Sequence, residues 1–409
     1  MTRDERVYGA ARWLAGRGIR DGSRVALDVP DVLPWFLGAD LLGAATLVVE
    51  PSWTPRERAA VLADAQPDLV VSGVAAPAGE PLERAGTGET FFYLPTTSGS
   101  SGSPKVLVRT RDSWVRSFEA LGALPGPVLV PGPLSSSLFL FGALHGRWCG
   151  REVRTLPRWD PEAAAGVGAA TVHLVPAMLS ALLAVLERRA EPSPLRTVVC
   201  GGAHLGDDVR ARFAAVLPRA ELIEYYGSAE HSLIAVRRGG DGLRPVPGVD
   251  LDVRDGVLWV RSPLACSGRL RDGRLVPAGE WSTVGDLVSF SASGALTVRG
   301  RAGAVVSSGG RLVPAEEVEA VLRTAPGVAD VLVTGTPHPR LGELVTAVVE
   351  GDVRLRELRA VARAALAPAN RPRRWLVAKE LPRTASGKPA RALIAEQLAA
   401  GTLPAEPLT

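Results

Sequence analysis

The sequence contains very little lysine. Of its 47 basic residues, only Lys105, Lys379 and Lys388 are lysines. Lys105 and Lys388 lie in glycine-bearing segments, at residues 97–105 and 382–388. A lysine ammonium on its flexible stem reaches phosphate or carboxylate oxygens as a point charge, which a planar guanidinium does less well. The composition therefore indicates two candidate lysines for phosphate chemistry.

Several other residue types are scarce. The odd set Cys149, Cys200 and Cys266 has no metal-type spacing, which argues against a disulfide framework and against zinc. Aromatic residues make up 5%, and no basic run is interleaved with them, so no nucleic-acid partner is expected. The start of the chain lacks an apolar signal core, and the apolar stretch 33–49 is interrupted by Asp40. We expect a cytoplasmic protein in a reducing compartment, with no membrane segment.

The charge is mildly basic, with a formal net charge of +4 spread along the chain. The one dense cluster contains Arg371, Arg373 and Arg374. This cluster is either a solvated face or an anion site for a phosphorylated partner.

The pattern of apolar residues predicts an α/β fold. Short β-rich runs alternate with helical ones up to residue 224, as in parallel βαβ units. Between residues 248 and 299 helical patterns vanish, and Asp255-Gly256 and Asp272-Gly273 mark turns of a small antiparallel barrel or meander. We predict a large N-terminal domain over 1–301, with layered βαβ sheets and a small β-barrel. A small, mobile α+β C-terminal domain would cover 302–409.

A Gly/Ser/Thr turn follows the apolar run 91–94. Its backbone N–H groups and hydroxyls can surround an anion, and its glycines allow a close approach. The spacing is not that of a Walker loop, and alone it is equally typical of a flexible loop. The candidate phosphate-binding residues are Thr97, Ser98, Gly99, Ser100, Ser101, Gly102 and Lys105.

A second segment ends a predicted strand with Tyr226, Gly227, Ser228 and, two residues later, Glu230. The tyrosine can stack on a base, and the carboxylate can hold Mg²⁺ beside phosphates. The alternative is a strand end with a surface glutamate.

These segments resemble core motifs of the adenylate-forming superfamily, which includes acyl-CoA synthetases, peptide-synthetase adenylation domains and luciferases. The motifs occur in the family's order between Thr97 and Lys388. The resemblance implies that Lys388 and Glu230 are catalytic, with Mg²⁺ on Glu230, and that Gly303 is the hinge. It also implies nucleotide-binding roles for Gly201, Gly202, Ala203, Tyr226, Gly227, Ser228, Asp286 and Arg301.

Three positions depart from the family's pattern. Val106 stands where glycine is usual. Ala229 replaces a threonine, so a hydroxyl contact to the α-phosphate is missing or comes from Ser228. Gly303 replaces the hinge aspartate, and its wide conformational freedom keeps a hinge plausible.

The acyl pocket is predicted from Ser135, Ser136 and Ser137 together with His204 and His231. The serines are equally typical of a capped helix start. The segment between residues 119 and 151 holds no carboxylate, which argues against an amino-acid substrate.

The resemblance implies ATP-dependent activation of a small carboxylic acid, with Mg²⁺, followed by transfer to CoA. One alternative is an adenylating enzyme that transfers to a carrier protein or an amine, or that activates another oxyacid. The remaining alternative is a non-catalytic scaffold.

Overall fold

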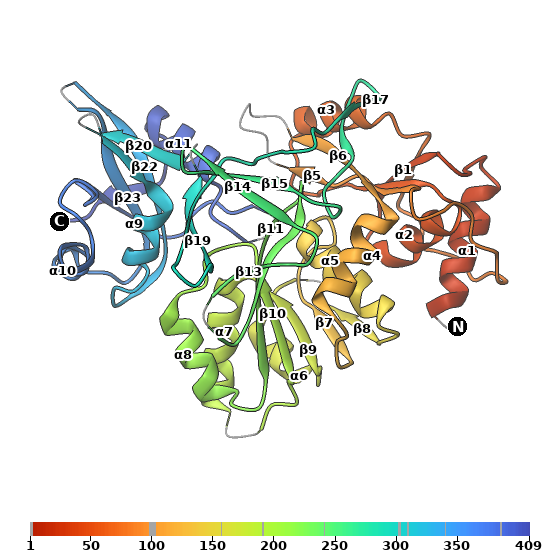
Figure 1. Cartoon of the computed structure of the whole chain (residues 1–409), viewed down its shortest axis with the longest axis horizontal. Coiled ribbons are helices and arrows are strands. Elements are labelled where there is room, and N and C mark those ends of the chain that lie inside the picture. Colours follow the sequence, from red (N-terminus) through yellow and green to blue (C-terminus); the bar gives the residue numbers. More distant parts are fainter. Residues whose placement is uncertain are drawn as a thin grey trace.

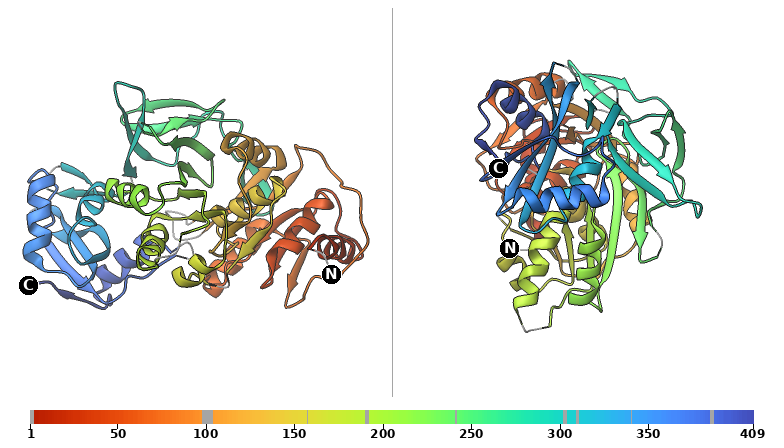
Figure 2. Two further views of the ribbon diagram at one scale, coloured as in Figure 1. Left: turned by 90° about the horizontal axis from the view of Figure 1, so that it is seen from below. Right: turned by 90° about the vertical axis from the view of Figure 1, so that its left-hand side faces the viewer.

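The computed structural model describes residues 3–97, 104–156, 158–189, 192–240, 242–301, 304–308, 311–339, 341–384 and 387–409. The described chain forms two β-sheets with helices, a third small sheet, and a separate C-terminal unit at one end (Figure 1). The two termini lie at opposite ends of the molecule (Figure 2).

The first sheet has the strand order β17-β16-β6-β4-β2-β1-β3, with β5 paired to β6. Strands β1 to β4 pair in parallel, and β6, β16 and β17 continue the sheet in antiparallel fashion. Its strands are β1 (Arg24–Asp28), β2 (Ala45–Val48), β3 (Leu69–Ser72), β4 (Phe91–Tyr93), β5 (Thr96–Thr97), β6 (Lys105–Thr110), β16 (Gly268–Arg271) and β17 (Arg274–Pro277). The helices of this region are α1 (Arg3–Ala15), α2 (Val32–Leu41) and α3 (Pro55–Ala65).

Local sequence explains where α3 begins. The Thr54 hydroxyl accepts from the Glu57 backbone N–H, and the Glu57 carboxylate accepts from the Thr54 backbone N–H. Pro55 occupies the first helical position, where its missing N–H costs nothing.

The second sheet has the order β13-β12-β11-β10-β9-β7-β8, with a parallel core from β8 to β11. Its strands are β7 (Val128–Val130), β8 (Val153–Thr155), β9 (Thr171–Leu174), β10 (Thr197–Gly201), β11 (Glu221–Ser228), β12 (Ser232–Arg238) and β13 (Arg244–Pro245). The helices are α4 (Arg111–Leu121), α5 (Ser137–Trp148), α6 (Pro161–Gly166), α7 (Pro176–Arg188) and α8 (Asp207–Val216).

The helix-free segment predicted between residues 248 and 299 forms strands, which are divided between two sheets. The hairpin β16–β17 joins the first sheet through β6. The other strands form a four-stranded antiparallel sheet, namely β14 (Asp250–Arg254), β15 (Val257–Arg261), β18 (Asp286–Phe290) and β19 (Leu296–Arg301).

The C-terminal unit has a hydrophobic core of its own, formed by residues between Val306 and Trp375. Its strands are β20 (Val305–Ser308), β21 (Arg311–Pro314), β22 (Val328–His338), β23 (Gly342–Gly351), β24 (Arg374–Ala378) and β25 (Ala405–Pro407). Its helices are α9 (Ala315–Leu322), α10 (Leu355–Ala365) and α11 (Arg391–Ala400). The predicted boundary at 301/302 stays a prediction. None of the helices in the described ranges is long and apolar enough to cross a bilayer.

Three histidines of the N-terminal part are buried and titrate abnormally. Burial lowers the pKa of His173 to about 3, with a smaller effect of His145. Burial also lowers the pKa of His145 to about 4, although its bond to the Gly122 carbonyl acts in the opposite direction. The pKa of His231 is lowered to about 4, first by burial and then by Arg109.

We therefore predict that the protein loses stability in mild acid. Below pH 6.5 these histidines become protonated in the unfolded chain, whereas in the folded chain they stay neutral until about pH 3–4. The free energy of unfolding therefore falls as the pH falls through this window. The slope is about 1.4 kcal/mol per pH unit for each histidine. Urea unfolding at several pH values measures it, and His173→Phe should reduce the slope by one histidine's share. A pH-independent free energy of unfolding would contradict this prediction.

Candidate active site

The candidate site lies at the carboxyl ends of the parallel strands β10 and β11, where open α/β sheets bind ligands. Gly201 at the end of β10 pairs with Tyr225 of β11. A methyl group built onto Gly201 would lie 2.4 Å from Cζ of Tyr225, so only glycine fits under this ring. Gly202 follows with φ +84°, a conformation that favours glycine.

The C-terminal unit contributes Lys388 to this point. A methyl group built onto Gly202 would lie 3.4 Å from Lys388 Nζ and 2.8 Å from Leu138 Cδ1 of α5. The fold therefore brings the lysine that is distant in sequence to the carboxyl end of β10.

The loop that carries Lys388 is held by Arg383. Its guanidinium donates to Asp330 at 2.9 Å and Glu350 at 2.8 Å, and to the Gly387 carbonyl at 3.1 Å. The Lys388 carbonyl accepts from the Thr384 backbone N–H at 2.7 Å. The lysine therefore projects from a braced turn.

Tyr226 and Asp286 meet beside the strand ends. The Tyr226 hydroxyl donates to the buried Asp286 carboxylate. Gly285 directly before it has φ +81°, and its N–H donates to Thr283 at 2.9 Å. Arg301 ends β19 and is the register partner of Asp286.

Ser228 is already engaged within the fold. It accepts from the His231 backbone N–H at 3.1 Å and contacts His231 Nδ1 at 3.1 Å. His231 Nε2 lies 2.9 Å from the Ser282 hydroxyl. The structure thus joins His231 to Ser228 and Ser282, and among the described residues no hydrogen bond links His231 to Ser135, Ser136 or Ser137.

Arg109 is a candidate positioning residue that the sequence did not reveal. It lies on β6, four residues after Lys105, and is 1% exposed. Its guanidinium donates to the Ala229 carbonyl at 2.6 and 3.1 Å and to the Leu264 carbonyl at 2.7 Å. It thereby fixes the backbone next to Glu230. Burial lowers the pKa of Arg109, and Cys266 and Glu230 oppose this shift.

The phosphate-loop residues are only partly described. Thr97 and Lys105 are register partners at the ends of β5 and β6. The residues between them that we predicted to bind phosphate lie outside the described residues, as does the predicted hinge; they are Ser98, Gly99, Ser100, Ser101, Gly102 and Gly303.

The predicted acyl-pocket residues are spread around the start of α5. The Ser135 hydroxyl donates to Glu50 at 2.7 Å, and Ser137 lies 3.0 Å from the Tyr93 hydroxyl. Ser136 is the N-cap residue of α5. The fold thus brings a carboxylate, Glu50, to a segment whose own sequence holds none. Tertiary structure therefore weakens the sequence argument against an amino-bearing acid.

Two further predicted residues follow the β10 end. Ala203 and His204 are exposed. Although His204 keeps solvent access, the chain around it removes part of the water from its ring; this partial desolvation lowers the pKa of His204, and Arg210 and Arg323 lower it further.

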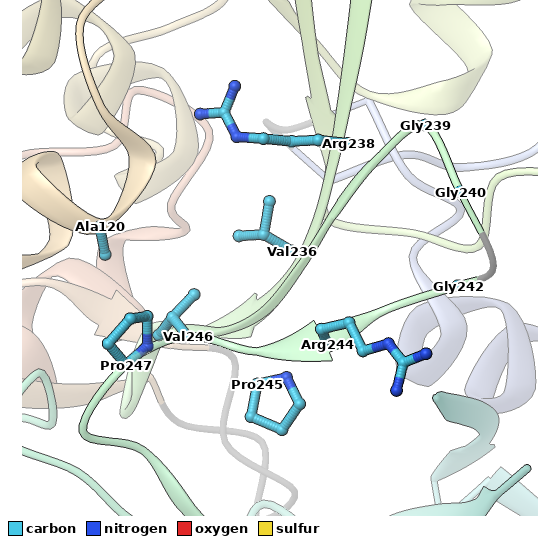
Figure 3. Close-up of a pocket in the computed structure, with 10 residues that line it drawn as sticks. All are labelled: Ala120, Val236, Arg238, Gly239, Gly240, Gly242, Arg244, Pro245, Val246 and Pro247. Atoms are coloured by element: carbon cyan, nitrogen blue, oxygen red, sulfur yellow. The ribbon is translucent and has the colours of Figure 1, made fainter. Parts of the chain in front are cut away.

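A surface hollow of about 390 Å³ lies between α4, β12 and β13 (Figure 3). Arg238 and Arg244 point away from each other there, and their guanidinium groups donate to the carbonyls of Leu121 and Ser293. Because the two cations do not converge, this hollow is not our candidate site.

Of the two carboxylates in the candidate site, Asp286 accepts from Tyr226, and Glu230 is the candidate ligand for a magnesium ion. Within the described ranges, no three His, Cys, Asp or Glu side chains form a metal cluster. Mg²⁺ on nucleotides is held by one or two carboxylates and by the phosphates themselves, so Glu230 alone fits such an ion.

Comparison with known proteins agrees with this geometry. Residues 3–85 and 74–268 match the AMP-binding enzyme family, and residues 317–388 match its C-terminal domain. The chain belongs to the AMP-binding enzyme family. The resemblance, the α/β fold and the enzyme class predicted from the sequence are thus confirmed.

Three relatives illustrate the match. The uncharacterized acyl-CoA ligase YhfT of Bacillus subtilis (strain 168) is 28% identical over 97% of this chain and 92% of that protein. ATP-bound MatB from Rhodopseudomonas palustris has a TM-score of 0.83, 22% identity and coverage of 98% and 93%. The amide bond synthetase McbA from Marinactinospora thermotolerans has a TM-score of 0.81, 26% identity and coverage of 97% and 94%.

Replacing Arg109 tests its positioning role. Arg109→Met should lower the free energy of unfolding by about 2 kcal/mol or more, because two buried carbonyl groups lose their donor. Arg116→Met, an exposed arginine of α4, is the matched control and should change stability by less than about 0.5 kcal/mol. Equal values for the two variants in denaturant unfolding would contradict the role.

Proposed function

We propose that the chain uses ATP to activate a carboxylic acid as an acyl-adenylate and then transfers the acyl group to CoA. In the first step a carboxylate oxygen attacks the α-phosphorus and pyrophosphate leaves. In the second step a thiolate attacks the acyl carbon and AMP leaves.

One observation carries the proposal. Lys388 of the C-terminal unit lies against Gly202, at the carboxyl end of the strand that neighbours β11, on which Tyr226 is located. An ammonium in this place can contact carboxylate and phosphate oxygens together, and it stabilises the charge that builds between them.

The other residues would bind the nucleotide. Tyr226 and Asp286 would hold the base and the ribose, and Thr97 and Lys105 would approach the phosphates. Glu230 would hold Mg²⁺, which supplies charge neutralisation for the phosphate oxygens. The buried clamp of Arg109 on Ala229 keeps Glu230 in position.

The two candidate functions differ in the molecule that accepts the acyl group in the second step. YhfT is described as an acyl-CoA ligase, and this supports CoA. McbA is described as an amide bond synthetase and matches at 26% identity, which supports an amine as the alternative. A carrier-protein thiol is a further alternative.

Pyrophosphate exchange over a panel of carboxylic acids tests the first half-reaction. AMP release is then measured with CoA, with an amine or with neither. Exchange without any CoA-dependent thioester would overturn the CoA assignment, and absence of exchange with every acid would overturn the enzyme proposal.

Lys388→Ala should reduce pyrophosphate exchange by about 10²–10³, the usual effect of removing one stabilising group from a transition state. Thioester formation from supplied acyl-adenylate should survive, since no pyrophosphate departs in that step. Lys379→Ala is the matched control, because Lys379 is an exposed lysine of the same unit. Equal losses in both half-reactions would contradict the assigned role.

Asp286→Asn should raise KM for ATP more than it lowers kcat. Ribose contacts are made in the ground state and the transition state alike, so their loss weakens binding without slowing the chemical step. Steady-state kinetics with varied ATP measure both constants. A change confined to kcat would rule out the ribose contact.

A further inference from the structure

Two buried histidines lie between α5 and β9 with unused hydrogen-bonding groups. His145 of α5 is fully buried, and its Nε2 donates to the Gly122 carbonyl at 2.7 Å. This bond fixes the neutral tautomer, so Nδ1 is a bare acceptor. Among the described residues, His145 Nδ1 and both ring nitrogens of His173 are buried without a hydrogen-bond partner.

Such groups are costly. A buried polar atom without a partner destabilises the folded state, because it has lost its hydrogen bonds to water and gained none in the protein. The ring centroids of His145 and His173 lie 6.3 Å apart at 82°, so the pair does not satisfy itself. Together they present two acceptors and one donor at one place in the core.

This place lies directly below the candidate active site. Leu138 and Gly142 are four residues apart on α5 and therefore share one face of the helix. Leu138 contacts the Gly202 position next to Lys388. A methyl group built onto Gly142 would lie 2.6 Å from Cγ of His173, so His173 lies about one helical turn, ~5.4 Å, deeper than Leu138.

The register of strands β9 and β10 also places His173 below the candidate active site. His173 is the register partner of Val199, and Val199 lies two residues before Gly201 on β10. Alternate residues of a strand share a face, so His173, Val199 and Gly201 line one face of the sheet. Two side chains that wall the way from Lys388 to His173, Leu138 and Val199, are apolar, and the ring of Tyr225 lies against Gly201 on the same face.

We propose that His173, with His145 behind it, is the polar floor of the acyl pocket and selects acids that bear a hydroxyl group at the end remote from the carboxylate. This inference rests on the proposed function. A hydroxyl both donates and accepts, so it can satisfy the unused nitrogens. The acid enters past the half-buried Leu138 and keeps its carboxylate beside Lys388. A flat aromatic ring suits the apolar walls.

Binding is measured first, by titration calorimetry without ATP, using 4-hydroxybenzoate against benzoate and 4-hydroxycinnamate against cinnamate. The wild-type protein should bind the hydroxylated acid of at least one pair about tenfold or more tightly, as expected for one net hydrogen bond. His173→Phe should abolish this preference while it keeps the affinity for the plain acid. His173→Leu serves as a second variant if the first does not fold.

Pyrophosphate exchange with the same acids separates the two proposals. Preferential binding without exchange would overturn the proposed function and leave the polar floor standing. Exchange without a preference for hydroxylated acids, or no binding of any of the four acids, would overturn the polar floor. A preference that persists in His173→Phe would also overturn it.

Discussion

The close approach of Lys388 to the end of β10 is the contact on which the site depends. It joins two units with separate hydrophobic cores, at a glycine where a methyl group would lie 2.8 Å from Leu138 Cδ1 and 3.4 Å from Lys388 Nζ. Leu138 of α5 reaches the same point, so the helix, the strand and the C-terminal loop converge on one glycine. Any side chain at position 202 would meet both Leu138 and Lys388, and the positive φ adds a second reason for glycine.

The buried polar groups of the two units fall into two classes. Glu319 of α9 is buried, yet it accepts from the Val333 N–H at 2.8 Å and from Arg391 at 2.5 Å. Burial raises the pKa of Glu319, while Arg391 and Arg323 oppose this shift. A buried charge satisfied in this way specifies one arrangement of the unit. His173, in contrast, remains unsatisfied, and evolution tolerates such a cost chiefly at functional sites.

The sequence predicted the sheets and the strand-end motifs well, because these depend on local apolar runs and on glycines next to them. It could not predict Arg109, which lies in an apolar run of β6 and looks like a strand residue with an exposed charge. Its partners are 120 and 155 residues away in the chain. The contact between Glu50 and Ser135 could not be predicted for the same reason, since only the fold brings the two residues together. The polar floor required knowledge of which ring nitrogens lack partners, and no spacing reveals that.

The arginines and the lysines near the site occupy different kinds of position. The arginines near the site act as forks that join several fixed acceptors at once: Arg109 binds two carbonyls, and Arg383 binds two carboxylates and a carbonyl. A planar guanidinium can donate to several fixed acceptors in different directions at once, which suits such positions better than a single ammonium does. A lysine is advantageous where the acceptor belongs to a ligand that changes during a reaction, because a flexible point charge can follow it. The two lysines in the glycine-bearing motifs, Lys105 and Lys388, are thus placed where the proposed reaction requires mobile charge.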